Sequence, residues 1–151
     1  MTAKEYLEQV KRKDAQINNL IREKQDLWLK MCSVSGTQYD SDRVQSSINP
    51  DKLGMLYSRL EDKEEQIASR IDELCDFRIE VTNLINGLSK SEYIVILYSR
   101  YVLFKPWGEI AADLSYSIRQ VQRLNGKGLA EFYDLYHEQL HLNKDVAQCH
   151  I

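Results

Sequence analysis

A short segment in the last third of the chain combines basic and amide side chains at helical spacing. Residues 117–128 contain Arg119, Arg123 and Lys127 and no acidic residue. Arginine can donate two hydrogen bonds to a guanine edge, and glutamine can pair in a similar way with adenine. Because Arg119 and Arg123 are four residues apart, both project from one face of a helix. This pattern predicts a helix that contacts base edges in the major groove of DNA.

A recognition helix needs a second helix to hold it, and the preceding residues fit one. Ala111 is small where two helices must cross closely, and Ser117 is a residue type that caps helix N-termini. Apolar residues flank the crossing, namely Ile110, Leu114, Val121 and Leu124. We therefore expect a helix-turn-helix with helices near 106–114 and 117–136. Its turn, Ser115-Tyr116, lacks the glycine that often occupies this place.

The exposed side chains of the second helix are the candidate DNA-binding residues, which are Ser117, Ile118, Arg119, Gln120, Gln122 and Arg123. Lys127 and Lys105 are expected to bind the phosphate backbone. Gly126 and Gly128 interrupt the same helix, each at a cost of about 1 kcal/mol relative to alanine. Close packing against another helix would explain them. The alternative is a solvated helix face with no ligand.

Two long heptad repeats precede this segment. Residues 3–31 and 53–88 each place apolar residues at steps of four and three, which is typical of a coiled coil. The stretch 33–50 between them is rich in Ser and Asp and predicts a loop. We expect an antiparallel hairpin that dimerises, with register set by polar seam positions at Asp14, Lys24, Glu64 and Arg78. Lys24 and Glu64 fall near the same level of such a hairpin. An alternative is that each helix pairs with a partner chain.

The predicted fold is therefore all-α. Gly87 ends the second long helix, and Ser89–Glu92 fits the capping box of a third helix. Its apolar face would carry Ile94, Leu97, Tyr98 and Tyr101. We expect a helical hairpin domain at 1–88, a helix-turn-helix domain at 89–136 and a frayed tail at 137–151.

Composition narrows the possible classes of protein. The net charge of −3 is unevenly distributed, because residues 51–86 hold five Lys/Arg and nine Asp/Glu, whereas 117–128 carry three basic residues alone. The three cysteines form no CxxC pair, the N-terminal residues lack a signal sequence, and no apolar run approaches the ~20 residues of a membrane span. These features favour a cytoplasmic protein without a membrane segment.

One motif points to zinc chemistry. His137-Glu-Gln-Leu-His141 matches the H-E-x-x-H spacing of zinc hydrolases. A third ligand at the required spacing and a strand to hold substrate are not apparent, and no phosphate loop or nucleophile elbow is visible. We therefore expect no enzyme activity, no metal site and no cofactor.

Residues 88–132 resemble the fourth region of bacterial sigma factors. The match includes Leu88, Glu92, Arg100-Tyr101, Glu109-Ile110-Ala111, Ser117, Val121 and Lys127-Gly128-Leu129. Nearly the whole chain resembles the small sigma-like regulators of Gram-positive phages and prophages, the ArpU-like and RinA-like late transcription activators. The resemblance implies a sequence-specific regulator of phage genes that acts with RNA polymerase of the bacterial host.

The sequence departs from sigma factors where they contact bases. Those positions usually carry Arg, Glu, Arg, Arg and Gln, whereas this chain has Ile118, Arg119, Gln120, Gln122 and Arg123. The expected target is therefore not the ordinary promoter element. Two other functions fit the pattern: a DNA-packaging protein of the small-terminase type, and a sigma-like module that binds polymerase or another protein without contacting DNA.

Overall fold

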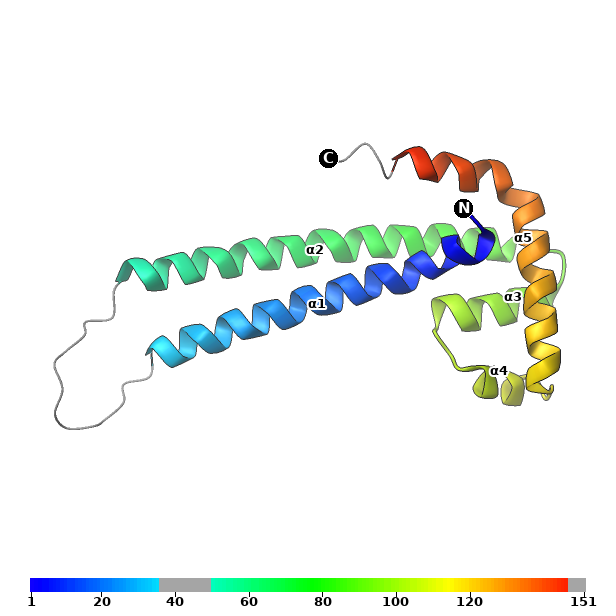
Figure 1. The fold of residues 1–151 in the computed structure, drawn as a ribbon, viewed down its shortest axis with the longest axis horizontal. Coiled ribbons are helices and arrows are strands. Elements are labelled where there is room, and N and C mark those ends of the chain that lie inside the picture. The colour runs from blue at the N-terminus through cyan, green and yellow to red at the C-terminus, as the bar shows by residue number, and fades with distance from the viewer. Residues whose placement is uncertain (36–49, 147–151) are drawn as a thin grey trace. The chain divides into compact units, whose positions relative to one another are not determined.

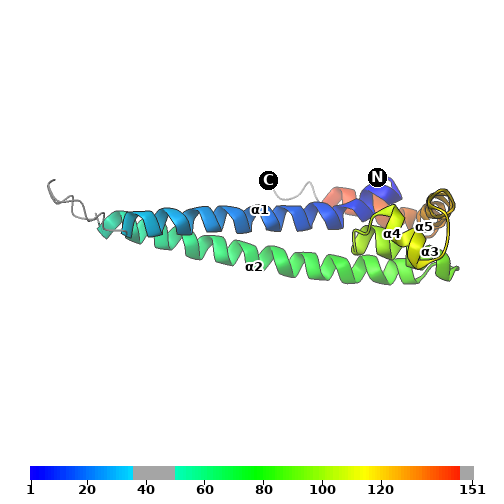
Figure 2. The same ribbon diagram turned by 90° about the horizontal axis from the view of Figure 1, so that it is seen from below.

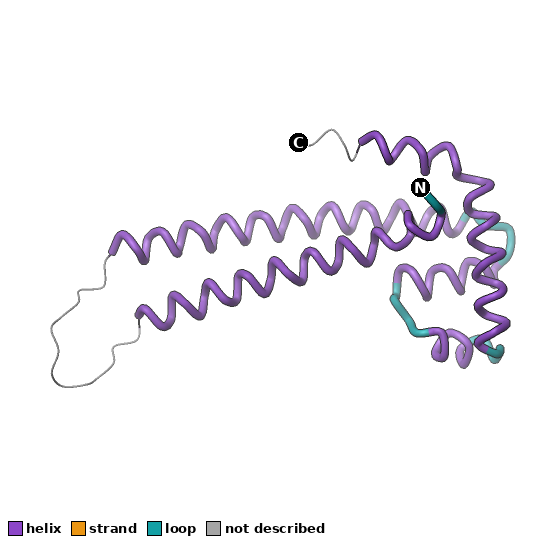
Figure 3. The backbone as a smooth tube through the Cα atoms, in the orientation of Figure 1, coloured by secondary structure: helices purple, strands orange, loops and turns teal. Residues whose placement is uncertain are grey.

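The computed structural model describes residues 1–35 and 50–146, with side chains for 1–33 and 51–138. Its elements are α1 (Ala3–Ser35), α2 (Pro50–Asn86), α3 (Ser91–Leu97), the π-helical turn η1 (Tyr98–Val102), α4 (Trp107–Asp113) and α5 (Ile118–Val146) (Figure 1). All secondary structure within these ranges is helical, as Figure 3 shows. The all-α prediction is thus confirmed for the described residues. Most of the predicted loop, residues 36–49, lies outside them.

The chain divides into two compact units, which we call the distal unit (residues 14–73) and the main unit (residues 1–13 and 74–151). This division differs from the predicted domain boundary at residue 88. The difference arises from Tyr6, whose ring centroid lies 5.4 Å from that of Phe77 and 6.3 Å from that of Phe132. The Tyr6 hydroxyl also donates a 2.6 Å hydrogen bond to Glu80. The start of α1 therefore packs with the end of α2 and with α5.

In the distal unit, segments of α1 and α2 lie side by side, as Figures 1 and 2 show from two directions. Lys24 and Glu64, which were predicted to fall near the same level, form an ion pair, with Nζ 2.6 Å from Oε1. Lys63 pairs in the same way with Glu23 at 2.5 Å. Asp14, another predicted seam position, accepts a 3.2 Å hydrogen bond from Asn18.

The third helix begins later than predicted. α2 ends at Asn86 and Gly87 follows it, as expected. The capping box at Ser89 is wrong, because α3 starts at Ser91 after Lys90 and has no side-chain cap. The Ser89 backbone N–H instead donates a 2.6 Å hydrogen bond to Glu131 of α5. A carboxylate distant in the sequence thus satisfies the group that the capping box would have used.

The π-helical turn η1 was not predicted. Arg78, expected to set register in the hairpin seam, instead donates a 2.8 Å hydrogen bond to the carbonyl of Val102 at the end of η1. Of the predicted apolar face of the third helix, Leu97 and Tyr101 are buried. Tyr93, Ile96 and Val102 are buried as well, although the predicted face did not include them.

The helix end predicted near residue 136 is wrong, because α5 continues to Val146. Residues 137–146 contain no glycine or proline that would stop a helix. The predicted frayed tail is therefore helical over most of its length, and residues 147–151 lie outside the described residues.

Candidate nucleic-acid interface

A small apolar core holds α4 against α5 in the main unit. Its buried members are Ile96, Ile110, Ala111 and Val121, and Trp107, Leu114, Tyr116 and Leu124 pack against them. The predicted burial of Ile110 and Val121 is confirmed, and Ala111 is buried beside them. Since a core residue fixes the rotation of the helix that carries it, Val121 determines which side of α5 is exposed.

The turn between α4 and α5 adopts a left-handed conformation without glycine. Ser115 has φ of 55°, a conformation that glycine adopts at lower cost. The following N–H, of Tyr116, donates a 2.9 Å hydrogen bond to the Ala111 carbonyl and so closes the end of α4. The Tyr116 hydroxyl donates a 2.8 Å hydrogen bond to Glu92 of α3, and this bond raises the pKa of Tyr116. Tyr116 therefore fixes the turn to α4 through its backbone N–H and to α3 through its hydroxyl.

Ser117 caps the N-terminus of α5, as predicted. Its Oγ accepts a 3.2 Å hydrogen bond from the N–H of Gln120, and its carbonyl accepts a 3.0 Å bond from Val121. The cap satisfies one of the four N–H groups that a helix leaves unpaired at its start.

The remaining candidate residues lie on the first turns of α5. Gln120 is half-buried, and the exposed members are Ile118, Arg119, Gln122, Arg123 and Lys127. Arg119, Arg123 and Lys127 follow one another at steps of four residues, so their side chains share one face of the helix. We call this face the basic face.

The basic face differs from the other positive charges of residues 74–138. Residues 74–138 contain seven Lys or Arg side chains. Arg78 binds a carbonyl, Lys90 lies 5.4 Å from the Tyr93 ring centroid, and Arg100 lies 4.5 Å from that of Trp107. Lys105 forms ion pairs, described next. The three residues of the basic face have no such partner within the described residues.

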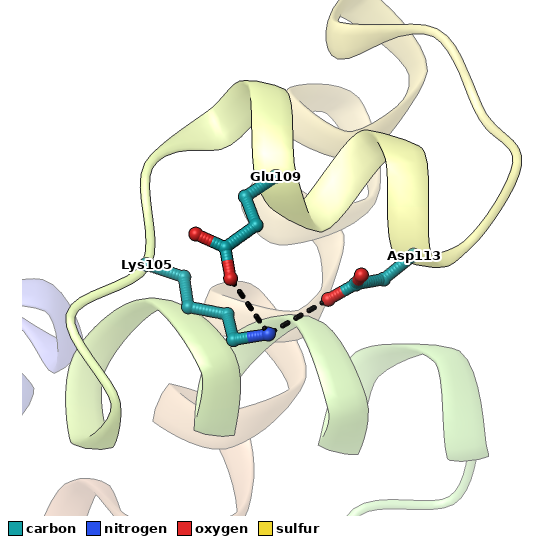
Figure 4. A network of polar contacts seen from close by, with 3 residues as sticks. All are labelled: Lys105, Glu109 and Asp113. Atoms are coloured by element: carbon teal, nitrogen blue, oxygen red, sulfur yellow. Dashed lines mark hydrogen bonds and ion pairs between the residues drawn. The ribbon is translucent and has the colours of Figure 1, made fainter.

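Lys105 was predicted to bind phosphate, but the structure gives it two carboxylate partners (Figure 4). Its Nζ lies 2.8 Å from Asp113 Oδ2 and 3.0 Å from Glu109 Oε1. The hydrogen bonds to Asp113 and then Glu109 raise the pKa of Lys105. Both acids are on α4, so the positive charge is balanced locally. Sequence reasoning missed this because Pro106 separates the lysine from its partners.

Two residues inside α5 gain a structural explanation. A Cβ at Gly128 would lie 3.2 Å from Tyr93 Cβ and 3.5 Å from Leu97 Cδ1, so this glycine permits α3 and α5 to pack closely.

Asn125 is buried, and its Oδ1 has no hydrogen-bond partner within the described residues. Burial raises the pKa of Tyr101, and a hydrogen bond with Asn125 opposes that effect. The four-residue step from Val121 to Asn125 was the available signal that Asn125 is buried.

The H-E-x-x-H motif lies on the later part of α5. His137 is exposed, and its Nδ1 is 3.2 Å from the carbonyl of Asp134. The side chain of His141 lies outside the described residues. Among the side chains that are described, no group of three or more His, Cys, Asp or Glu could hold a metal ion.

Within the described helices, none combines the length and apolar character needed to cross a membrane.

Compared with known proteins, the chain matches no family model, no curated protein and no solved structure.

Proposed function

We propose that this chain is a sequence-specific double-stranded DNA-binding protein that contacts DNA with the first turns of α5. The basic face carries this proposal. The other cations of residues 74–138 are engaged with a carbonyl, rings or carboxylates, whereas Arg119, Arg123 and Lys127 are exposed and unpaired within the described residues. Cations that no acid neutralises are suited to phosphates and to the acceptor groups of guanine.

In this proposal α4, the turn and α5 form a helix-turn-helix, and the long parts of α1 and α2 form an antiparallel helical hairpin. The Ser117 cap and the buried Val121 support the first assignment, because they orient α5 with its basic face outward. The Lys24–Glu64 and Lys63–Glu23 pairs support the second assignment.

The residues of the interface have different roles. Arg119 and Arg123 contact base edges, and Lys127, one turn later, contacts phosphate. Ser117 places the positive end of α5 near a phosphate, while Ile118, Gln120 and Gln122 contact the groove around the arginines. Lys105 is left out of the interface because Asp113 and Glu109 balance its charge.

We further propose that the protein regulates transcription of phage or prophage genes in the bacterial cytoplasm, together with host RNA polymerase. This part rests on the sigma-like sequence resemblance of residues 88–132. It implies action by binding, with no catalytic step or cofactor.

The distal unit supports a homodimer. Trp28 and Tyr57, both on the predicted seams, are each 54% exposed. A second copy would cover such apolar surface and add to a core that two helices alone leave thin. Light scattering at micromolar concentration should give twice the chain mass, and Trp28→Glu with Tyr57→Glu should give a monomer. A parent chain that is monomeric under these conditions would refute the dimer and leave DNA binding unaffected.

Selection of bound sequences from a random double-stranded DNA pool tests the main proposal. Arg119→Ala and Arg123→Ala should each cost about 1–3 kcal/mol on the selected site and relax preference at one base pair. Lys127→Ala should weaken binding evenly across sequences and lower the slope of log K against log salt by about one unit.

The matched control is Arg59→Ala, which removes an exposed arginine of the distal unit and should leave binding unchanged. Circular dichroism must show that each variant keeps its helix content. Folded Arg119→Ala and Arg123→Ala variants that bind the selected site as tightly as the parent would contradict base contact by α5.

A further inference from the structure

Gly126 is a helix-interior glycine that the folded chain does not require. It lies well inside α5 and is exposed, and a Cβ added there would meet nothing within 4 Å. Glycine in this setting destabilises a helix by lowering its propensity. Gly128, two residues later, is different, because Tyr93 and Leu97 occupy the space beside it. Packing within the chain therefore explains Gly128 but not Gly126.

The position of Gly126 places it on the basic face. It follows Arg119 by seven residues and Arg123 by three, and it directly precedes Lys127. At 3.6 residues per turn, positions 119, 123 and 126 point in similar directions. At Gly126 the helix backbone therefore carries no side chain, and the nearby Arg123 and Lys127 are cations without a partner within the described residues.

DNA geometry gives this bare point a physical role. The major groove is about 12 Å wide, close to the diameter of a helix with its side chains. Between Ile118 and Gly126 the helix axis advances about 12 Å, and α5 then continues as far as Val146. A helix that starts in the groove with its axis across it passes one of the strands that border the groove within this length. At that crossing a side chain on the facing side would hold the two backbones apart.

We propose that the sugar–phosphate backbone of one DNA strand lies directly against α5 at Gly126, with Arg123 one turn before it along the helix and Lys127 directly after it. This inference rests on the proposed function and adds to it where the helix leaves the groove. The absence of a side chain permits the close approach of the helix backbone to a ligand. It also lets the Lys127 ammonium reach a phosphate without extending past an intervening side chain.

The proposal predicts that stability and affinity change in opposite directions. Gly126→Ala and Gly126→Gln should both raise the melting temperature, by roughly 2–4 °C, because both residues favour helix and neither meets an obstacle. On the selected DNA site at fixed salt, Gly126→Gln should raise Kd about tenfold or more. Gly126→Ala should raise it less. The control is Ala68→Gln, which adds the same side chain to an exposed helical position in the distal unit and should not change Kd.

The possible outcomes separate this inference from DNA binding itself. If the parent selects a site and Gly126→Gln binds it within twofold of the parent, the close approach at Gly126 is wrong and DNA binding stands. A parent that selects no DNA from the pool overturns the proposed function and this inference together. Raised melting temperature with weakened binding supports both.

Discussion

The region of α3, α4 and α5 and the distal unit use apolar residues in different ways. In the first, Ile96 and Val121 are fully buried and Ile110 is 1% exposed. In the second, Ile17 and Leu60 are buried, but Trp28, Tyr57 and Ile71 remain 54%, 54% and 42% exposed. Both regions follow a helical period, so periodicity alone does not distinguish a closed core from an open one. The helices α3, α4 and α5 enclose a core, whereas two helices side by side leave one side of each helix in solvent.

This contrast bears on function, because a binding face must be held in place before it can discriminate between ligands. The buried Val121 and the Ser117 cap fix the rotation of α5 and thereby the direction of Arg119 and Arg123. The exposed apolar residues of the distal unit do not fix the rotation of a helix in this way. They are available for association instead.

The largest expected effect comes from opening the closed core. Ile110→Ala should reduce the free energy of unfolding by about 2–5 kcal/mol, because it removes a fully enclosed side chain and leaves a cavity. Ile71→Ala in the distal unit should cost less than about 1 kcal/mol, since the parent side chain already contacts water. Urea unfolding followed by circular dichroism measures both. An equal loss at the two positions would remove the distinction between the regions.

The features that sequence reasoning predicted correctly are local or periodic. The burial of Ile110 and Val121 and the cap at Ser117 follow from apolar spacing and hydrogen-bonding capacity within one or two turns. The Lys24–Glu64 pair joins polar seam positions of the two heptad repeats that were predicted to lie near the same level. Both kinds of signal depend on short stretches of sequence whose geometry is regular.

The features that it missed depend on contacts between distant residues. Glu131 accepts a hydrogen bond from the Ser89 N–H, and Arg78 donates one to the Val102 carbonyl. In both pairs the residues are far apart in the sequence, and helical periodicity does not predict which of them meet. Lys105 was predicted to be available because its partners lie beyond Pro106. α5 extends beyond the predicted boundary at residue 136 because a helix can continue where its apolar pattern ends. A helix needs no apolar face where its residues favour helix and nothing interrupts it.

A smaller effect is expected from filling the space that Gly128 leaves. Gly128→Leu should destabilise the main unit by roughly 1–3 kcal/mol, because the new side chain must displace Tyr93 and Leu97. Thermal unfolding measures the change. Gly126→Leu is the matched control, because it adds the same side chain to α5 at a position where an added Cβ meets no atom within 4 Å. A Gly128→Leu protein as stable as that control would show that α3 and α5 pack less closely than described.

Alkaline pH tests the burial of Tyr101. Burial raises its folded-state pKa above the ordinary value of 10.0. A raised folded pKa contributes stability that is fully present below pH 10 and is lost as pH rises through the folded pKa. Tyr101→Phe should therefore lose less stability than the parent between neutral pH and pH 11, as measured by melting temperature. Tyr133→Phe, at an exposed position, should follow the parent. Parallel curves for parent and Tyr101→Phe would contradict the burial.

The smallest effect concerns the turn that joins α4 to α5. Ser115 and Phe104 are the two non-glycine residues with positive φ among those described, at 55° and 59°. A left-handed conformation costs a non-glycine residue about 1–2 kcal/mol, and glycine escapes this cost but is more flexible when unfolded. Ser115→Gly should therefore stabilise the main unit by up to about 1 kcal/mol. Ser115→Ala, which keeps a Cβ, should not stabilise it. The comparison is clean because the Ser115 side chain is exposed, and the backbone bond from Tyr116 to Ala111 survives either change. If Ser115→Gly lowered the melting temperature, the left-handed turn would be wrong, and with it the angle at which α4 presents α5.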